Sequence, residues 1–402
     1  MKVGWELKKL GDLADVEYGF TDKSYDDGYF RYVRITDIDD NGELIPTNKK
    51  YVIHSKEAEK FIILNNDLLM ARTGATFAKV LLYEEAEPSV FASYLIKIKF
   101  RVSIENKLYW YFSKSKSYWE QANRLASGAA QPHFNGAALK QVLFPFPTSK
   151  FEQQHIVSIL DEAFAAIDKA KANAEKNLKN AKELFESYLQ GVFENKGDGW
   201  EDCTLESHIK LIDYRGRTPE KTDSGTRLIT AKNVKLGYLQ LEPQEFIAED
   251  SYMSWMSRGI PNFGDVIFTT EAPIGNVAQI DTTEKVAFAQ RIIVMQPNPS
   301  KLNQDFLKYL LISNPIRNKI LGKATGATVL GIKSSLLKKI GISFPASIDE
   351  QLVIVQTLDA LSSETKRLES IYQQKLTDLE ELKKSILQKA FNGELKTADI
   401  CV

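Results

Sequence analysis

The longest regular pattern of apolar positions runs through residues 149–195, where apolar side chains recur at alternating steps of four and three residues. From Ile156 the predicted seam passes through Leu160, Ala163, Ile167, Ala170, Ala174, Asn177, Ala181, Leu184 and Tyr188. A second seam, within residues 347–393, passes through Leu358, Leu361, Thr365, Leu368, Tyr372, Lys375, Leu379, Leu382 and Ile386. Heptad spacing predicts long helices that pack on partner helices. The alternative is that each helix packs separately on its own domain.

The two helical segments belong to a duplication of the whole chain. Glu152-Gln153 returns as Glu350-Gln351, a shift of 198 positions (350 − 152). The same shift relates further matches, which are Asp67 to Asp265, ASGAA (126–130) to ATGAT (324–328), and Phe146-Pro147 to Phe344-Pro345. A fixed internal repeat of this length indicates two consecutive copies of one structural module.

The regions before each long helix have a mixed pattern. Short β-branched or aromatic runs such as RYVRI, KVLLY, SYLIKIKF, DVIFTT and RIIVM are bounded by Gly, Asn and Pro, which is typical of strands. Helical segments are expected at 106–125 and 304–321. The predicted fold class is therefore α+β, with two tandem mixed α/β domains separated by two long helices. If a pseudo-two-fold axis relates the halves, these helices form an antiparallel coiled coil, and Asn177 and Lys375 meet near the crossing point.

These patterns set the expected domain boundaries. We expect a first domain at 1–148, a long helix at 149–195, a second domain at 196–346, a second long helix at 347–393, and a C-terminal tail at 394–402.

Composition narrows the class of protein. The 402 residues, 43% of them hydrophobic, are enough for two domains with cores of their own. The longest apolar runs are far shorter than the roughly 20 residues that cross a bilayer, and the N-terminus lacks the apolar centre of a signal peptide. We therefore expect a cytoplasmic protein. Cys203 and Cys401 are the two cysteines, which argues against a disulfide framework or a thiolate zinc site.

Motifs for catalysis are missing from the sequence. It contains no GxxxxGK[ST] phosphate loop, no GxGxxG turn after a strand and no HExxH. An Asn/Asp-Pro-Pro-aromatic turn, expected of an amino-group methyltransferase, is also missing. Asp281, Glu284 and Lys285 have only a loose nuclease-like spacing, which a solvated turn explains better. Asp67 and Asp265 each precede an apolar strand, where a turn or cap role is the simpler interpretation.

Side chains suited to nucleic acid are more abundant. Arginine pairs with guanine, Asn and Gln pair with adenine, and Lys or backbone amides hold phosphates. The candidates are Arg31, Arg34, Arg72, Lys79, Arg124, Gln131, His133, Arg215, Arg217, Lys232, Asn233, Arg291, Lys323 and Lys333. With a net charge of −1, any such surface depends on uneven placement of the basic residues. The loops that begin at Ser127-Gly128 and Thr325-Gly326 either let the backbone approach a phosphate or are tight turns that need glycine.

The duplicated order of motifs resembles the specificity subunit of Type I restriction-modification enzymes. The resemblance rests on DYRGRTPEK, NDLLMARTG, GDVIFTT, Phe-Pro followed by Glu-Gln, and the ending KKSILQKAFNGEL with its counterpart FESYLQGVFEN. It implies two target recognition domains that each read one half of an asymmetric, split DNA sequence. It also implies a non-catalytic chain that serves DNA methylation and restriction carried out by other subunits.

The same resemblance implies partners and their cofactors. Two modification (methyltransferase) subunits carry S-adenosylmethionine, and restriction (motor-nuclease) subunits use ATP and Mg. We expect the partners to dock on apolar helix ends, at Phe185, Tyr188, Leu189, Phe193, Ile386, Leu387 and Phe391. The alternative is that these side chains pack on the adjacent domain. Two rival functions remain, a coiled-coil scaffold with two protein-binding domains and no DNA role, and a nuclease that acts alone.

Overall fold

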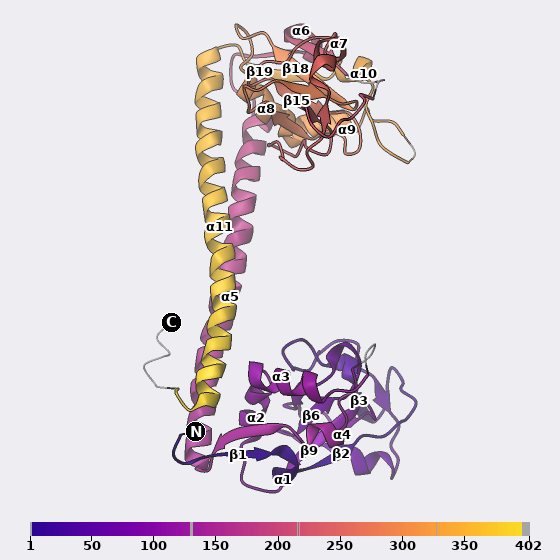
Figure 1. Cartoon of the computed structure of the whole chain (residues 1–402), viewed down its shortest axis with the longest axis vertical. Helices are drawn as coiled ribbons and strands as arrows, with labels where there is room; N and C mark the ends of the chain where they lie inside the picture. Colours follow the sequence, from indigo (N-terminus) through magenta and orange to yellow (C-terminus); the bar gives the residue numbers. More distant parts are fainter. Residues whose placement is uncertain (1, 129–131, 215, 217, 327, 396–402) are drawn as a thin grey trace. The chain divides into compact units, whose positions relative to one another are not determined.

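The computed structural model describes residues 2–128, 132–214, 216, 218–326 and 328–395. The chain divides into two compact units (Figure 1). The first unit comprises Met1–Glu175 and Gln373–Val402, and the second comprises Lys176–Tyr372. Each unit therefore contains one mixed domain together with parts of both long helices.

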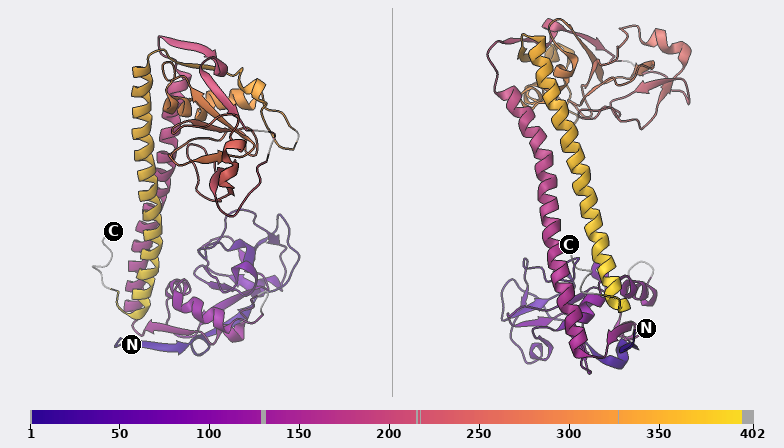
Figure 2. Two further views of the ribbon diagram at one scale, coloured as in Figure 1. Left: turned by 45° about the horizontal axis from the view of Figure 1, so that its top comes forward. Right: turned by 90° about the vertical axis from the view of Figure 1, so that its left-hand side faces the viewer.

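The two long helices are α5, Lys150–Glu194, and α11, Ile348–Asn392. The expected ranges, 149–195 and 347–393, differ from these bounds by one residue at each end. In the first unit the beginning of α5 lies alongside the end of α11, as Figures 1 and 2 show from three sides. The amino group of Lys171 binds the Glu380 carboxylate at 2.6 Å across this pair. In the second unit the end of α5 shares a core with the beginning of α11. Opposite ends are paired in each unit, so the helices are antiparallel.

The prediction that Asn177 and Lys375 form a polar pair within the seam is wrong. Asn177 and Lys375 are both exposed, whereas the next residues, Leu178 and Leu376, are half-buried. After Ala174 and Tyr372 the seam therefore takes a step of four residues where we expected a step of three. The two leucines are related by the same shift of 198, so both helices keep an apolar seam at this level.

Replacing Asn177 and Lys375 together by leucine is expected to change the free energy of unfolding by no more than about 0.5 kcal/mol, because exposed positions contribute little. Replacing Leu178 and Leu376 by serine is expected to cost about 1–3 kcal/mol, because half-buried apolar area is lost. Urea unfolding followed by circular dichroism measures both. An equal loss in the free energy of unfolding for the two double variants would contradict the placement of Leu178 and Leu376 in the seam.

The apolar helix ends are buried, so the expected docking surface is wrong for most of its residues. Leu189 and Phe193 belong to the core of the second unit, and Phe185 packs against that core. Ile386, Leu387 and Phe391 belong to the core of the first unit. Tyr188 alone among the seven is exposed, at 42%. The adjacent domain covers the other six, as the alternative interpretation held.

The first unit is built on two four-stranded sheets. Its strands are β1 Trp5–Lys9, β2 Ala14–Tyr18, β3 Phe30–Val33, β4 Tyr51–Val52, β5 Ile62–Ile63, β6 Leu68–Ala71, β7 Val80–Leu82, β8 Ser89–Phe91, β9 Leu95–Phe100 and β10 Leu143–Pro147. One sheet has the order β2-β9-β6-β7 with antiparallel pairs, and the other has the order β4-β3-β8-β5 with β3 and β8 parallel. The strands β1 and β10 form a separate antiparallel pair.

Short helices cover this domain. They are α1 Leu10–Leu13, α2 Asn106–Phe112, α3 Lys116–Leu125 and α4 Gly136–Leu139. The helical segment expected at 106–125 is thus divided in two. The division occurs because the Ser115 hydroxyl accepts a hydrogen bond from the backbone N–H of Tyr118 and starts α3 as its cap.

The second unit repeats this plan with small differences. Its strands are β11 Trp200–Thr204, β12 Ile209–Asp213, β13 Thr226–Ile229, β14 Phe246–Ile247, β15 Val266–Thr269, β16 Val277–Gln279, β17 Val286–Phe288, β18 Ile292–Pro297 and β19 Gly341–Pro345. Its short helices are α6 Leu205–His208, α7 Tyr252–Trp255, α8 Gln304–Ile312, α9 Asn314–Leu321 and α10 Ser334–Leu337. The sheets have the orders β12-β18-β15-β16 and β14-β13-β17, beside the pair β11-β19. The segment expected as one helix at 304–321 is again divided, into α8 and α9.

The repeated Glu-Gln motif has a structural role. Gln153 is fully buried, and its side-chain oxygen accepts a hydrogen bond from the N–H of Glu105 at 2.8 Å. Its amide group donates to the carbonyl oxygens of Ser103 and Pro147, at 3.2 and 2.9 Å. Gln351 makes the same three kinds of bond in the second unit. Each glutamine therefore ties the start of a long helix to the domain that precedes it.

Replacing Gln153 by alanine is expected to lower the free energy of unfolding by about 2–4 kcal/mol, because the change removes three hydrogen bonds, one buried and two partly buried, and leaves their backbone groups without this partner. Gln154→Ala is the matched control, since Gln154 is the exposed neighbour and its loss is expected to change little. Urea unfolding midpoints measure both. Equal midpoints for the two variants would show that the buried hydrogen bonds are not needed.

Candidate nucleic-acid interface

The two units build the same backbone frame at one end of their antiparallel sheets. Arg72 follows β6, and its N–H donates to the carbonyl oxygen of Tyr94 at 3.0 Å. Its counterpart Thr270 follows β15 and donates to the carbonyl of Arg291 at 2.9 Å. The carbonyls of Arg72 and Thr270 accept from Phe134 and Ile332, at 2.9 and 3.0 Å. Three chain segments thus meet at equivalent points in each unit. We call this arrangement the frame, and it consists of the segments at Arg72, Tyr94 and Phe134 in the first unit and at Thr270, Arg291 and Ile332 in the second.

The third segment is the Ser/Thr-Gly loop. Ser127 and His133 exchange two backbone hydrogen bonds, at 3.0 and 2.7 Å. Thr325 and Gly331 do the same at 2.8 and 2.9 Å. Gly326 has φ +130°, and an added Cβ would lie 2.1 Å from the carbonyl oxygen of Val329, so only glycine fits there. The tight-turn interpretation is therefore confirmed for Gly326, and the approach of a phosphate to these loops stays a prediction.

The side chains at this frame differ between the two units. In the first unit they are an arginine, two tyrosines and a histidine. The guanidinium of Arg72 lies 5.4 Å from the ring centre of Tyr18 and 5.6 Å from that of Tyr94, which is the geometry of cation–π contact. The hydroxyl of Tyr18 accepts a hydrogen bond from the N–H of Gly136 at 2.8 Å, which fixes the ring. Tyr94 is 54% exposed, and His133 in the Ser-Gly loop is also exposed. The result is a positioned cation between aromatic rings at the surface.

The second unit presents an acid and a base instead. The Nε of Arg291 binds the Glu271 carboxylate at 2.9 Å, and both side chains are exposed. Arg291 has φ +77°, an unfavourable backbone conformation for a bulky residue and one that often marks a functional position. These side chains border a polar hollow of about 670 Å³ to its open mouth, together with Gly216, Thr270, Gln290, Thr325 and Lys333.

Gly216, from the DYRGRTPEK motif, also lines this hollow. It has φ +92°, as a sharp bend in the loop requires. Its neighbours Arg215 and Arg217, which we singled out from the sequence, lie outside the described residues, as does Gln131 of the first unit.

Two predicted DNA contacts are wrong because the side chains are buried. Arg31 is 1% exposed, donates from Nη2 to the carbonyl of Ile45 at 2.9 Å and lies 3.8 Å from Glu85 and Glu87. Asn233 is also 1% exposed, and its amide oxygen accepts from the N–H of Thr230 at 3.0 Å. Burial of this kind leaves neither side chain free to reach DNA.

The other described candidates are at least partly exposed. Arg34 is held by Asp37 at 2.7 Å, Lys79 by Asp40 at 2.6 Å, and Lys232 lies 3.9 Å from Glu245. Arg124 and Lys323 are exposed a few residues before the Ser/Thr-Gly loops, near the frame in sequence. The structure therefore brings together Arg72 with His133 in one unit and Arg291 with Lys333 in the other.

Sequence reasoning missed the aromatic and acidic members of the frame. Tyr18 and Tyr94 in the first unit and Glu271 in the second were not among the candidates. A signal was present, because Glu271 lies directly after the GDVIFTT motif and one position after the counterpart of Arg72. The two aspartates were interpreted correctly: Asp67 and Asp265 accept hydrogen bonds from the N–H groups of Leu64 and Asn262, both at 2.7 Å, and so form turns.

Sites of other kinds are not found in the described part of the chain. No group of three or more His, Cys, Asp or Glu side chains there is placed to hold a metal ion. Within the same residues, no helix is long and apolar enough to span a membrane. Asp281 and Glu284, of the loose nuclease-like set, are exposed.

The family model and the related proteins described below belong to one protein family. The family model described as Type I restriction modification DNA specificity domain matches residues 2–179 and 201–378. The chain is 22% identical to the Type I restriction enzyme MjaVIII specificity subunit of Methanocaldococcus jannaschii, over 98% of this chain and 94% of that protein. It is also 22% identical to the Type I restriction enzyme EcoBI specificity subunit of Escherichia coli, over 97% of this chain and 86% of that protein.

Solved structures show the same fold. The crystal structure of the HsdS subunit from Thermoanaerobacter tengcongensis matches with a TM-score of 0.68 at 19% identity, covering 98% of both chains. A chain from a study of complex assembly and conformational transition of the type I R-M system matches with a TM-score of 0.76 at 18% identity, covering 98% of this chain and 99% of that one. These likenesses support the predicted α+β fold with its paired long helices.

Proposed function

Because the chain belongs to the Type I restriction modification DNA specificity family, we propose that it reads an asymmetric, two-part DNA sequence for a multisubunit methyltransferase or endonuclease. One family match falls on each half of the chain. The relatives are named specificity subunits, and this chain is correspondingly a recognition subunit rather than an enzyme. Each unit reads one half-site.

The observation that carries this proposal is the repeated frame with unlike side chains. Equivalent backbone hydrogen bonds hold Arg72 and Thr270 in place, yet the neighbouring side chains are Tyr94 and His133 in one unit and Arg291 and Gly331 in the other. Two readers with one scaffold and different surface chemistry suit two different half-sites. The recognised sequence is therefore asymmetric.

The chemistry of each frame suits base edges. Arg72 and Arg291 are suited to the O6 and N7 acceptors of guanine, and Glu271 is suited to the amino group of cytosine. Lys333 and Lys323 are exposed and suited to phosphate contacts, which position a protein without specifying sequence. The paired Glu271 and Arg291 side chains satisfy each other until a base pair of matching donor and acceptor pattern replaces that bond.

Other subunits carry out the reaction under this proposal. Two modification subunits bring S-adenosylmethionine, and restriction subunits, where the system has them, bring ATP and Mg. The docking surface for these subunits excludes the six helix-end residues that the adjacent domains cover, five of them buried and Phe185 half-buried, and retains Tyr188.

The test maps modified adenines by long-read sequencing in cells with and without this gene. We expect a split, asymmetric motif that disappears with the gene. Purified chain with its modification subunits is expected to bind that motif with an affinity that falls steeply as salt rises, because phosphate contacts release counterions. A protein-binding scaffold predicts no salt-dependent DNA binding, and metal-dependent cleavage by the chain alone would favour the nuclease instead.

A further inference from the structure

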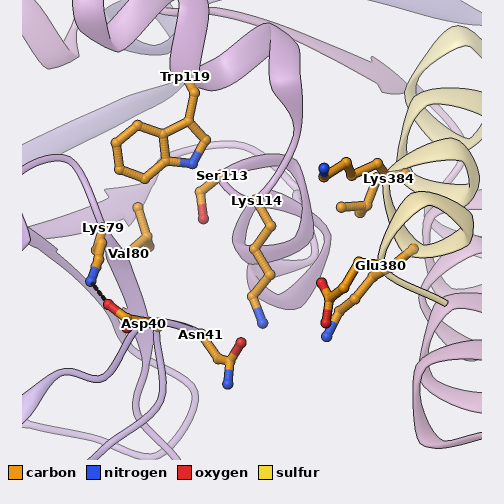
Figure 3. Close-up of a pocket in the computed structure, with 12 residues that line it drawn as sticks. Asp40, Asn41, Lys79, Val80, Ser113, Lys114, Trp119, Glu380 and Lys384 are labelled. Carbon is orange, nitrogen blue, oxygen red and sulfur yellow. Dashed lines mark hydrogen bonds and ion pairs between the residues drawn. The ribbon is translucent and has the colours of Figure 1, made fainter. Parts of the chain in front are cut away.

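A separate hollow lies in the first unit, and Arg72, Tyr94 and His133 are not among its lining residues (Figure 3). Its lining comes from the loop at Asp40–Gly42, from the link between α2 and α3, and from the last part of α11. The enclosed volume is about 180 Å³. That is below the roughly 300–1,000 Å³ of typical ligand pockets, so only a small ligand fits inside. All of its lining residues belong to the first unit.

Four lysines line this hollow, and three of them have carboxylate partners. Lys79 binds Asp40 at 2.6 Å, Lys384 binds Glu381 at 2.8 Å, and Lys383 lies 3.5 Å from Asp168. The fourth is Lys114, whose side chain extends into the space between Asn41 and Glu380 (Figure 3).

Lys114 has an unusual environment. Its amino group lies 3.2 Å from the centre of the Trp110 ring. No carboxylate of the described residues forms an ion pair with it, since the Glu380 carboxylate binds Lys171 at 2.6 Å instead. A cation in a partly buried site without a counter-ion is unfavourable, because it loses hydration and gains no ion pair.

The second unit shows that the fold does not require these lysines. At the shift of 198 the counterpart of Lys114 is Ile312, which is buried in the core of that unit. The counterparts of Lys383 and Lys384 are Phe185 and Glu186. One backbone plan therefore carries lysine at three positions in the first unit and at none of these in the second. A structural role common to both units does not explain the lysines.

The electrostatic environment of Lys114 favours the binding of an anion. Burial, with a smaller contribution from the charge of Lys383, lowers the pKa of Lys114 to about 7. The carboxylates of Glu43, Asp39 and Asp168 raise the pKa only in part. At neutral pH the amine is therefore only partly protonated, and a bound anion would favour its charged form.

We propose that this hollow binds a small phosphorylated ligand, with the phosphate held by Lys114 inside and by Lys79 and Lys384 at the rim. Several ammonium groups on three chain segments match an anion with two or more charges. Lysine binds phosphate as a point charge and tolerates varied geometry. The apolar wall of Val80, Trp119 and Leu387 receives the remainder of the ligand.

The experiment titrates pyrophosphate into the full chain by calorimetry, comparing wild type with Lys114→Met, Lys114→Arg and Lys116→Met. Lys116 is the matched control, because it is the neighbouring lysine and its side chain is 86% exposed. We expect saturable binding by wild type and Lys116→Met, and binding at least tenfold weaker by Lys114→Met. Circular dichroism melts confirm that each variant is folded.

The pH dependence separates Lys114 from the other lysines. A bound anion raises the pKa of Lys114, so affinity is greatest below the free pKa of about 7 and falls as pH rises above it. The arginine variant keeps its charge and reports only the ionisation of pyrophosphate itself. Wild-type affinity is therefore expected to fall more steeply with pH than that of Lys114→Arg. No saturable binding by wild type, equal binding by Lys114→Met, or parallel pH profiles would each overturn the proposal.

Discussion

Replacing Arg72 with alanine is expected to weaken specific DNA binding by about 1–3 kcal/mol, or roughly 5- to 150-fold, and to relax the sequence of one half-site. The guanidinium is held between Tyr18 and Tyr94, so it is already oriented before DNA arrives. A preoriented donor loses little conformational freedom on binding, and its removal therefore costs much of the contact energy. Gel-shift titration at fixed salt measures the affinity, and adenine mapping measures the motif.

Arg101→Ala is the matched control for this experiment. Arg72 and Tyr94 lie at one end of the β6–β9 pair, whereas Arg101 follows the other end of β9, where it pairs with Asp15. An arginine at the opposite end of the same sheet is expected to leave the motif unchanged. A motif that is equally relaxed by both variants, or by neither, would contradict the frame as the reading surface.

A substitution in the second unit is expected to affect the other half-site. Arg291→Ala is expected to relax the other half-site and to leave the half-site affected by Arg72→Ala unchanged. Losing the arginine leaves Glu271 without its partner, so the preference shifts toward bases that offer an amino donor. The two variants together assign one half-site to each unit.

Shortening both long helices by one heptad is the second large effect that we expect. Removing residues 175–181 and 373–379 keeps the seam in register, because matched positions are lost from both helices. Seven residues correspond to a rise of about 10.5 Å, or roughly three base pairs at 3.4 Å each. If the helices set the separation of the two readers, the spacer between half-sites shortens by about three base pairs while both half-sites keep their sequence.

A deletion in only one helix is the control for this change. It offsets the two apolar seams and is expected to lower the unfolding midpoint and to reduce DNA modification. Adenine mapping of the matched double deletion decides the question. A changed half-site with the original spacer would show that the helices do not measure the distance.

The long helices and the duplication were predictable because they depend on patterns along the chain. A heptad and a repeat at one constant shift are readable without coordinates, and each of the five predicted strand runs overlaps an observed strand. The register of the seam was not readable at its centre. Asn177 continues the strict alternation of four and three, whereas its neighbour Leu178 gives a second consecutive step of four, and burial shows that Leu178 occupies the seam.

The candidate interface was only partly predictable for a related reason. Arg31 and Arg34 look alike in sequence, but Arg31 is buried in the domain and Arg34 is at the surface. The contact of Arg72 with Tyr18 and Tyr94 joins residues far apart in the chain, and no local spacing encodes it.

The sequence by itself determined the duplication, the two long helices, the mixed domains and the family, since each depends on local pattern or on motif order. Only the tertiary structure decided which basic side chains are exposed, which apolar helix ends are covered and where Lys114 lies, without an ion pair to any described residue. Those properties depend on what other segments bring to each residue. Burial and electrostatic environment result from packing among distant parts of the chain, and a one-dimensional pattern does not contain them.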